Sequence, residues 1–426
     1  MEPLDNLAIL GLRTVCDLDR QVDLNPHAPF LVTKEESFTY GEVDRLVSGR
    51  VRDLGDRVGY QVVIRPGIDV ESVVEILAAA RSGATAVLVS AGLSDDLAAR
   101  QIHDAAQEDR PSQSILLTSG SSGVPKGVRL TKSNWEAAAS VSISRLGHGP
   151  ESRWLCPLPL HHVGGLSIIF RTVAAGGAIV LAPQPADLVA WMGRVQFASL
   201  VPTQLYRALE GRTETFTNKP VVLIGAGRSE PDLLASADAA GMTVLPTYGM
   251  TETTSQVATA RLGDPERGLM PLDGVDVRIG ADDRIEVRGP TVFPGYVGQA
   301  ERAAGDWFTT SDRGHIEPDG ALVVLGRTDR LIVTGGEKVD PAEVESAIES
   351  HPEVVEVGVL AIPDQEWGEA IAAAYVGNAS PDQLRSFVAK RVPSYAVPKR
   401  WLQLDVLPRT ELGKIDTARL MGMFDS

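Results

Sequence analysis

Residues 116–127 constrain this chain most, because a short apolar stretch leads directly into a loop of small residues. Ile115–Leu117 is predicted to be a buried strand, and Thr118–Gly123 carries four hydroxyls and two glycines but no bulky side chain. The backbone N–H groups and hydroxyls of such a loop can surround a polyphosphate, with Lys126 as a point charge. The spacing is not that of a Walker A motif. The alternative is a Ser/Gly linker, but linkers rarely lie between an apolar strand and a Pro-Lys-Gly stop.

Length and composition predict a multidomain globular protein. A chain of 426 residues exceeds the size at which one hydrophobic core keeps growing, and 43% apolar with 23% charged residues is ordinary for a soluble protein. A net charge of −16 argues against a nucleic-acid or anionic membrane surface. Cys16 and Cys156 give no disulfide framework, which favours a cytoplasmic setting. Met1–Leu12 lacks the basic region of a signal peptide, and no apolar run is long enough to span a bilayer.

Residues 1–110 and 135–245 alternate between helical and strand patterns, which predicts an α/β fold of βαβ units with mostly parallel sheets. In the predicted helix Gly41–Leu54, one face carries Val43, Leu46, Val47, Val51 and Leu54. After Glu252 the short strands and turns predict a small antiparallel β subdomain. Further helices are expected at 133–144, 163–174, 186–193 and 203–210, and strands at 62–64, 84–89, 154–156, 178–181, 197–201, 220–224 and 242–245.

A domain boundary is expected near residues 327–330, which divides the chain into 1–328 and 329–426. The second part begins two helices with Asp340-Pro-Ala-Glu343 and Ser380-Pro-Asp-Gln383, each combining an N-cap, a proline at the first helical position and an acceptor at the third. With strands predicted at 354–361, 371–376 and 401–406, it should form a smaller α+β lobe.

The loop at 118–127 and the segment Tyr248-Gly-Met-Thr-Glu-Thr253 resemble two signatures of the adenylate-forming ligases, the superfamily of acyl-CoA synthetases, luciferases and peptide-synthetase adenylation domains. The resemblance implies ATP, magnesium and coenzyme A. Tyr248 would stack on adenine beside Gly249, Thr251 would contact the α-phosphate, and Glu252 would hold magnesium. The other residues implied in ATP binding are Thr118, Ser119, Gly120, Ser121, Ser122, Gly123 and Lys126, of which Lys126 is also a catalytic candidate, like Thr251.

Four later segments extend the resemblance. Asp312 and Arg327 correspond to the residues that contact the ribose, although either alone could be half of a surface ion pair. Asp329 matches the hinge between the lobes, but Arg330 departs from the second acid common there. Gly335 and Gly336 would line the coenzyme A tunnel, or form an ordinary turn. The catalytic lysine is implied to be Lys414, where a positioned cation stabilises charge developing on phosphorus.

The predicted acyl pocket is built on Pro157-Leu-Pro-Leu-His-His-Val-Gly-Gly-Leu. His162, Gly164, Gly165 and Gly225 are its candidate residues. Within the superfamily these stretches look most like the o-succinylbenzoate:CoA ligases of menaquinone biosynthesis, although Lys338 and Arg228 depart from that branch. Because such a substrate keeps a second carboxylate, Arg228, with Arg171 behind it, is the candidate that binds this group.

The resemblance therefore implies an enzyme that converts ATP and an acid to acyl-AMP and pyrophosphate, and then to acyl-CoA and AMP. Three alternatives stay open: a ligase for another aryl or alkyl acid, an adenylation enzyme that loads a carrier-protein thiol, and a non-catalytic nucleotide-binding module. A dinucleotide-binding Gly-x-Gly-x-x-Gly at 225–230 fails because its last position is Glu230. The expected partners are small molecules, without nucleic acid or membrane insertion, and an oligomer is possible.

Overall fold

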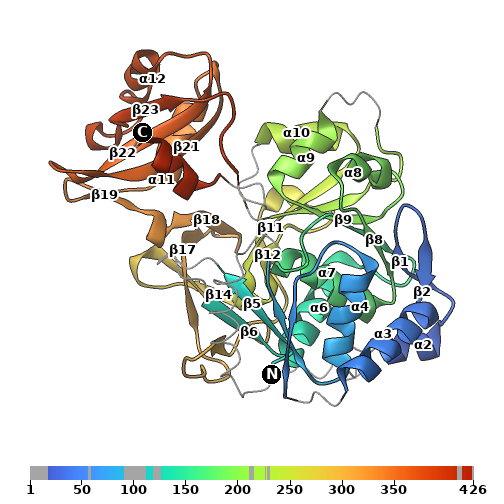
Figure 1. The fold of residues 1–426 in the computed structure, drawn as a ribbon. Helices are drawn as coiled ribbons and strands as arrows, with labels where there is room; N and C mark the ends of the chain where they lie inside the picture. The colour runs from blue at the N-terminus through green and yellow to red at the C-terminus, as the bar shows by residue number, and fades with distance from the viewer. Residues whose placement is uncertain are drawn as a thin grey trace. The chain divides into compact units, whose positions relative to one another are not determined.

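The computed structural model describes residues 18–55, 59–90, 112–118, 126–210, 215–225, 227, 231–409 and 415–424. They belong to two compact units (Figure 1). Unit 1 is drawn from residues 1–278, 286–309 and 316–323, and unit 2 from residues 279–285, 310–315 and 324–426. In this described part, no helix is both long and apolar enough to cross a membrane.

A nine-stranded sheet forms the largest part of unit 1, in the order β13-β12-β11-β10-β9-β7-β8-β1-β2. Its six central strands are parallel, whereas β2, β12 and β13 pair antiparallel at the edges. This confirms the predicted α/β class with a mostly parallel sheet. The strands are β1 (Pro29–Val32), β2 (Ser37–Thr39), β7 (Arg153–Cys156), β8 (Ala178–Leu181), β9 (Phe197–Leu200), β10 (Val221–Ile224), β11 (Thr243–Met250), β12 (Ser255–Thr259) and β13 (Met270–Pro271).

Helices connect and cover these strands because their apolar residues recur at helical spacing and pack on the sheet. One core cluster includes Leu155, Val180, Leu188, Met192 and Val222, all fully or almost fully buried. The helices of unit 1 among the described residues are α2 (Leu18–Leu24), α3 (Tyr40–Leu54), α4 (Val70–Arg81), α6 (Lys132–Leu146), α7 (Val163–Ala175), α8 (Pro185–Met192), α9 (Pro202–Leu209) and α10 (Pro231–Ala239).

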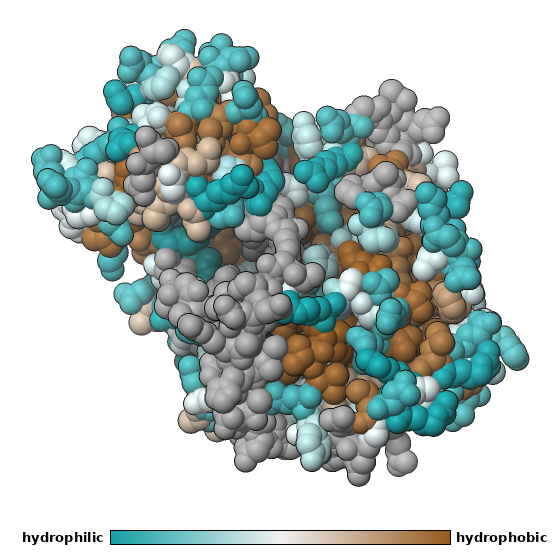
Figure 2. All heavy atoms as spheres, viewed as in Figure 1, coloured by the Kyte–Doolittle hydropathy of each residue, from teal (hydrophilic) through white to brown (hydrophobic). Residues whose placement is uncertain are grey.

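Helix α3 corrects one prediction. Val43 and Val47 are buried as expected, but Leu46 is 44% exposed, since the buried face is narrower than the predicted stripe. Figure 2 shows mainly hydrophilic residues over α2 and α3. An isolated exposed leucine on such a surface is common in soluble proteins.

A second sheet of unit 1 has the order β16-β6-β5-β4-β3. Strands β3, β4 and β5 are parallel, but β6 runs antiparallel to β5 and to β16. The strands are β3 (Gln61–Ile64), β4 (Thr85–Leu88), β5 (Ser114–Thr118), β6 (Lys126–Leu130) and β16 (Gly295–Tyr296). Neither β6 nor β16 was predicted, so assigning Lys126 and Gly127 to a loop was wrong.

The predicted small subdomain is the four-stranded sheet β14-β15-β17-β18, formed by Asp276–Ile279, Arg284–Arg288, Phe308–Ile316 and Leu322–Arg327. It includes residues of both units. Short 3₁₀ turns join or follow several strands: η1 (Thr251–Thr253), η2 (Pro265–Arg267), η3 (Ala281–Asp283), η4 (Thr328–Arg330) and η5 (Ser394–Ala396).

Unit 2 contains a five-stranded sheet in which β20, β19, β22 and β21 are neighbours and β23 pairs with β22. Both predicted N-caps are present: the Asp340 side chain accepts from Ala342 N–H, and Ser380 forms a capping box with Gln383. Strand β23 ends at Gln403, earlier than predicted, and Val406 is 75% exposed. The elements are β19 (Ile332–Thr334), β20 (Glu337–Val339), β21 (Val354–Asp364), β22 (Gly368–Gly377), β23 (Arg400–Gln403), α11 (Pro341–Glu349), α12 (Pro381–Val388) and α13 (Thr417–Phe424).

Candidate active site

The phosphate-loop candidates lie at the open end of the β5–β6 pair. Thr118 and Lys126 are directly opposite each other across the two strands, and Thr118 Oγ1 donates a hydrogen bond to the Lys126 carbonyl at 3.3 Å. Residues 119–125 therefore connect the ends of two paired strands. Ser119, Gly120, Ser121, Ser122 and Gly123 lie outside the described residues.

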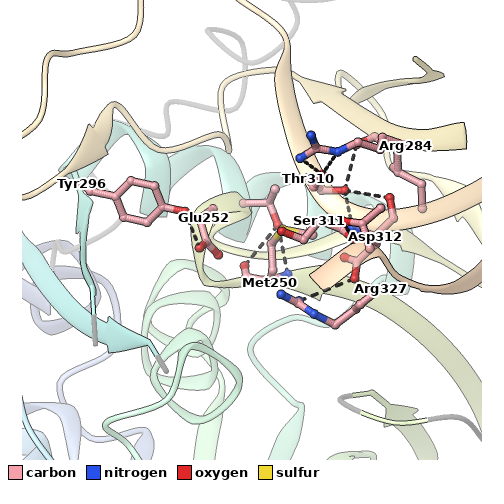
Figure 3. Close-up of polar contacts among 11 residues, drawn as sticks. Met250, Glu252, Arg284, Tyr296, Thr310, Ser311, Asp312 and Arg327 are labelled. Carbon is pink, nitrogen blue, oxygen red and sulfur yellow. Dashed lines mark hydrogen bonds and ion pairs between the residues drawn. The ribbon is translucent and has the colours of Figure 1, made fainter. Parts of the chain in front are cut away.

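Tyr296 brings together two residues that the sequence placed far apart. The Lys126 ammonium lies 5.4 Å from the centre of the Tyr296 ring, and the Tyr296 hydroxyl donates to Glu252 Oε1 at 2.9 Å (Figure 3). The pairing of β16 with β6 holds the tyrosine there, because Tyr296 is opposite Val128. Sequence reasoning missed Tyr296, since one tyrosine in a two-residue strand has no distinguishing pattern.

Glu252 can serve as a magnesium ligand. Magnesium usually takes one or two carboxylates and completes its shell with water and substrate phosphate oxygens. Among the described residues no group of three or more His, Cys, Asp and Glu side chains could hold a metal by itself. A single carboxylate at Glu252 fits a magnesium ion that also takes oxygens from water and substrate phosphates.

The segment around Glu252 is held by a strained turn. Tyr248 and Gly249 are still in strand β11, which extends to Met250 and so beyond the predicted end at residue 245. Turn η1 follows, and Ser255 has a φ of 91°, which L-residues rarely adopt. A Cβ atom on Gly249 would lie 1.5 Å from the Ser255 carbonyl oxygen, so this position requires glycine. Thr251 is half-buried at the start of η1.

Unit 2 contains both ribose candidates. Arg327 Nη1 lies 3.6 Å from Asp312 Oδ1, and Asp312 is 8% exposed (Figure 3). The Asp312 N–H donates to Thr310 Oγ1 at 3.0 Å, and Arg284 donates twice to the Thr310 carbonyl. The two side chains predicted to contact one ribose therefore contact each other. An ion pair whose arginine is half-exposed contributes little to stability. Stabilising the fold is therefore not needed to explain why Asp312 and Arg327 lie together.

Gly335 and Gly336 form the two-residue turn between β19 and β20, with φ values of 59° and 86°. Such tight hairpins favour glycine because both positions have positive φ. A Cβ on Gly335 would also lie 2.5 Å from the Trp367 ring. The side chain of Asp329 and all of Lys414 lie outside the described residues.

Three of the acyl-pocket candidates, His162, Gly164 and Gly165, lie at the beginning of α7. His162 is the N-cap residue but makes no side-chain capping bond, and its ring lies 4.2 Å from that of His161. Gly164 and Gly165 are in the first turn, where a Cβ on Gly165 would meet the Pro159 carbonyl at 2.4 Å. Gly225 directly follows β10, and Arg228 lies outside the described residues.

A cluster of buried ionisable groups lies beneath α7. His148 packs edge-on against Trp154, and Arg171 lies 4.9 Å from the centre of the Trp154 ring. Burial, and then the charge of Arg171, lowers the pKa of His148 to about 3. Burial also raises the pKa of Cys156 to about 12 and lowers that of Arg171 to about 9. At neutral pH, Arg171 is therefore the charged member.

Comparison with known proteins identifies the family. The "AMP-binding enzyme" model matches residues 105–297, and its C-terminal domain model matches residues 343–414. The 2-succinylbenzoate–CoA ligase of Geobacillus kaustophilus is 37% identical over 71% of this chain and 67% of its own length. That of Bacillus cereus AH820 is 30% identical over 93% of this chain and 96% of its own length.

Solved structures agree with the sequence matches. The o-succinylbenzoate CoA synthetase from Bacillus subtilis, in complex with its acyl-adenylate intermediate, has a TM-score of 0.85 and 28% identity, covering 97% of this chain and 98% of the other. The same enzyme with ATP and magnesium has a TM-score of 0.84 and 28% identity, covering 96% and 99%. The chain described here belongs to the AMP-binding enzyme family.

Proposed function

We propose that this protein is an ATP-dependent acid:CoA ligase acting on o-succinylbenzoate, forming acyl-AMP and pyrophosphate and then acyl-CoA and AMP. The observation that carries this proposal is the grouping of Lys126, Tyr296 and Glu252 beside the β5–β6 turn. The choice of acid rests on relatives named 2-succinylbenzoate–CoA ligase and on the related structure that contains the acyl-adenylate.

In the first step the acid needs no general base, because a carboxylate is already ionised near pH 7. Lys126 and Thr118 are proposed to bind the phosphates with residues 119–123, and Thr251 to contact the α-phosphate. Glu252 is proposed to hold the magnesium ion, which when bound neutralises phosphate charge. Lys414 is proposed to bind both the carboxylate and the α-phosphate. Tyr248 and Gly249 are proposed to hold the adenine, and Asp312 and Arg327 the ribose.

The second step is proposed to use a movement of residues 329–426 relative to residues 1–328. Asp329 is the proposed hinge, and the Gly335–Gly336 turn the proposed lining of the coenzyme A tunnel. The separate match of residues 343–414 to a C-terminal domain, and the compactness of unit 2, support this division. A cytoplasmic location and a possible oligomer are also proposed; neither affects the chemistry.

The test is acid-dependent AMP release from the purified protein across a panel of acids that includes o-succinylbenzoate, with and without coenzyme A. We expect the highest kcat/KM with o-succinylbenzoate and a thioester product only when coenzyme A is present. Greater release with another acid would reassign the substrate. Pyrophosphate exchange without a thioester would favour the carrier-protein alternative, and no ATP cleavage with any acid would contradict the proposal.

A further inference from the structure

Arg284 binds the backbone of the strand that carries the predicted ribose carboxylate. It begins strand β15, and its Nε and Nη2 both donate to the Thr310 carbonyl oxygen, at 2.8 Å and 2.6 Å (Figure 3). Hydrogen bonds from a charged donor are about twice as strong as those between neutral groups. Because two of them converge on one oxygen, they fix the position of the Thr310 peptide in strand β17.

The arginine at the other end of β15 makes different contacts. Arg288 donates from its Nε and Nη2 to Asp276 Oδ2, at 3.0 Å and 2.7 Å, and its guanidinium lies 4.5 Å from the centre of the Trp307 ring. Both members of this ion pair are exposed, so the pair contributes little to stability. Arg288 is therefore a useful comparison, because it lies in the same strand as Arg284 but binds a side chain instead of the backbone of β17.

The Thr310 side chain connects this fixed peptide to Asp312. Thr310 is 1% exposed, and its hydroxyl donates to the Ile285 carbonyl at 2.8 Å. The same hydroxyl oxygen accepts a hydrogen bond from the Asp312 N–H at 3.0 Å. The Asp312 amide thus binds a side chain that lies two residues before it in its own strand. This bond sets the direction of the backbone from which the Asp312 carboxylate projects.

A further hydroxyl holds the residue between Thr310 and Asp312. Thr328 Oγ1 donates to the Ser311 carbonyl at 2.9 Å, and Thr328 directly follows Arg327 in the chain. Asp312 is 8% exposed, so its side chain does not move freely in solvent. The backbone beside both members of the Asp312–Arg327 pair is therefore held by side chains that do not belong to the pair.

Binding a ribose through its two neighbouring hydroxyls requires such a fixed carboxylate. Both hydroxyls can donate to one carboxylate only when its two oxygens face them together. A misplacement of about 1 Å can cost an enzyme on the order of a hundred-fold in rate. Residues that fix the Asp312 backbone can therefore affect nucleotide binding without touching the nucleotide.

We propose that Arg284, acting through Thr310, is a positioning residue that directs the Asp312 carboxylate toward the 2′- and 3′-hydroxyls of the nucleotide. This inference rests on the proposed ligase function and deepens it, because it assigns residues that make the enzyme prefer a ribonucleotide. A nucleotide that lacks both hydroxyls gains nothing from the correct placement of Asp312. Loss of Arg284 should therefore weaken the binding of ATP selectively.

The test compares ATP with 2′,3′-dideoxyATP by measuring pyrophosphate release in the presence of o-succinylbenzoate. For Arg284→Met we expect KM for ATP to rise about ten-fold at nearly unchanged kcat, while KM for the dideoxy analogue changes less than about two-fold. Thr310→Val keeps the shape of the side chain and should raise KM for ATP about five-fold, with the same selectivity. Arg284→Lys keeps one donor for the Thr310 carbonyl and should restore part of the preference. Arg288→Met is the matched control and should leave the ratio of the two KM values unchanged.

Two results with the variants would overturn the proposal. Equal increases in both KM values for Arg284→Met would show a merely structural role. If that variant does not fold, an unchanged KM ratio in Thr310→Val would have the same meaning. The preference can also be measured without turnover, as the Kd values of AMP and 2′,3′-dideoxyAMP, and a wild type that binds both equally would likewise overturn the proposal. A wild type that distinguishes them but releases no pyrophosphate with any acid would instead contradict the ligase function.

Discussion

The residues proposed to hold the nucleotide and those proposed to hold the acid differ in their burial. Lys126 is exposed and Glu252 is half-buried, whereas Arg171, a candidate on the acid side, is 4% exposed, as is His148, which packs against the same Trp154 ring. Exposed charges can exchange water for a ligand at small cost, but enclosed charges must be stabilised by the fold or by the ligand. Substitutions of Lys126 or Glu252 should therefore change catalysis with little effect on stability. Substitutions of the buried residues on the acid side should change both.

The largest effect is expected from Glu252→Gln. Replacing the proposed magnesium ligand with a neutral amide should lower kcat for AMP release about 100- to 1000-fold, corresponding to ~3–4 kcal/mol of barrier. The Tm should change little, because Glu252 is not enclosed. The assay is AMP release over a range of magnesium concentrations, with Glu301→Gln as the control carboxylate. Retained activity at ordinary magnesium concentrations would remove Glu252 from the site.

Gly249→Ala should disturb the close backbone contact between Gly249 in strand β11 and Ser255. Its Cβ would lie 1.5 Å from the Ser255 carbonyl oxygen, which is backbone and cannot simply rotate away. We expect a loss of about 3 kcal/mol in the free energy of unfolding, measured by denaturant titration. Gly149→Ala is the matched control, since nothing lies within 4 Å of a Cβ at that position. Equal stability of the two variants would show that the turn at Ser255 adapts easily.

The residues proposed to hold the nucleotide could be chosen from the sequence, because they lie in short segments of distinctive composition. Even there, neither β6 nor β16 was predicted, and the place of Tyr296 near Lys126 depends on the pairing of these two strands. For the residues proposed to hold the acid, the sequence predicted the helix that carries them but not how their side chains are arranged. Helical spacing predicted a helix over 163–174, and α7 spans Val163–Ala175. That Arg171 is enclosed beside Trp154, with no carboxylate partner among the residues that the structure describes, depends on tertiary packing, which periodicity does not encode.

The pH dependence of the free energy of unfolding tests whether His148 is enclosed. Its pKa is lowered from 6.5 to about 3, first by burial and then by the charge of Arg171. Below pH 6.5 the unfolded chain therefore takes up a proton that the folded chain refuses, so stability present above pH 6.5 is lost as the pH falls toward 3. His148→Phe should remove up to about 1.4 kcal/mol per pH unit of that loss. The measurement is the free energy of unfolding from pH 7 to 4.

The control for His148 is His27→Gln, because it also removes a histidine but at an exposed position. Phenylalanine keeps the aromatic packing against Trp154 and Phe197. A slope that is identical in wild type and His148→Phe would mean that the imidazole is protonated in the folded protein beside Arg171. In that case His148 and Arg171 would be less well enclosed than their geometry indicates.

The smallest effect is expected from Tyr296→Phe, which removes the hydroxyl bonded to Glu252 and keeps the ring near Lys126. A hydrogen bond of this kind contributes about 1 kcal/mol, so kcat/KM for ATP should fall roughly five-fold. The loss should shrink as magnesium is raised, because the hydroxyl only orients the carboxylate. Tyr206→Phe, at a 62% exposed position, is the control. A loss that is independent of magnesium would instead assign the Tyr296 hydroxyl a direct contact with the nucleotide.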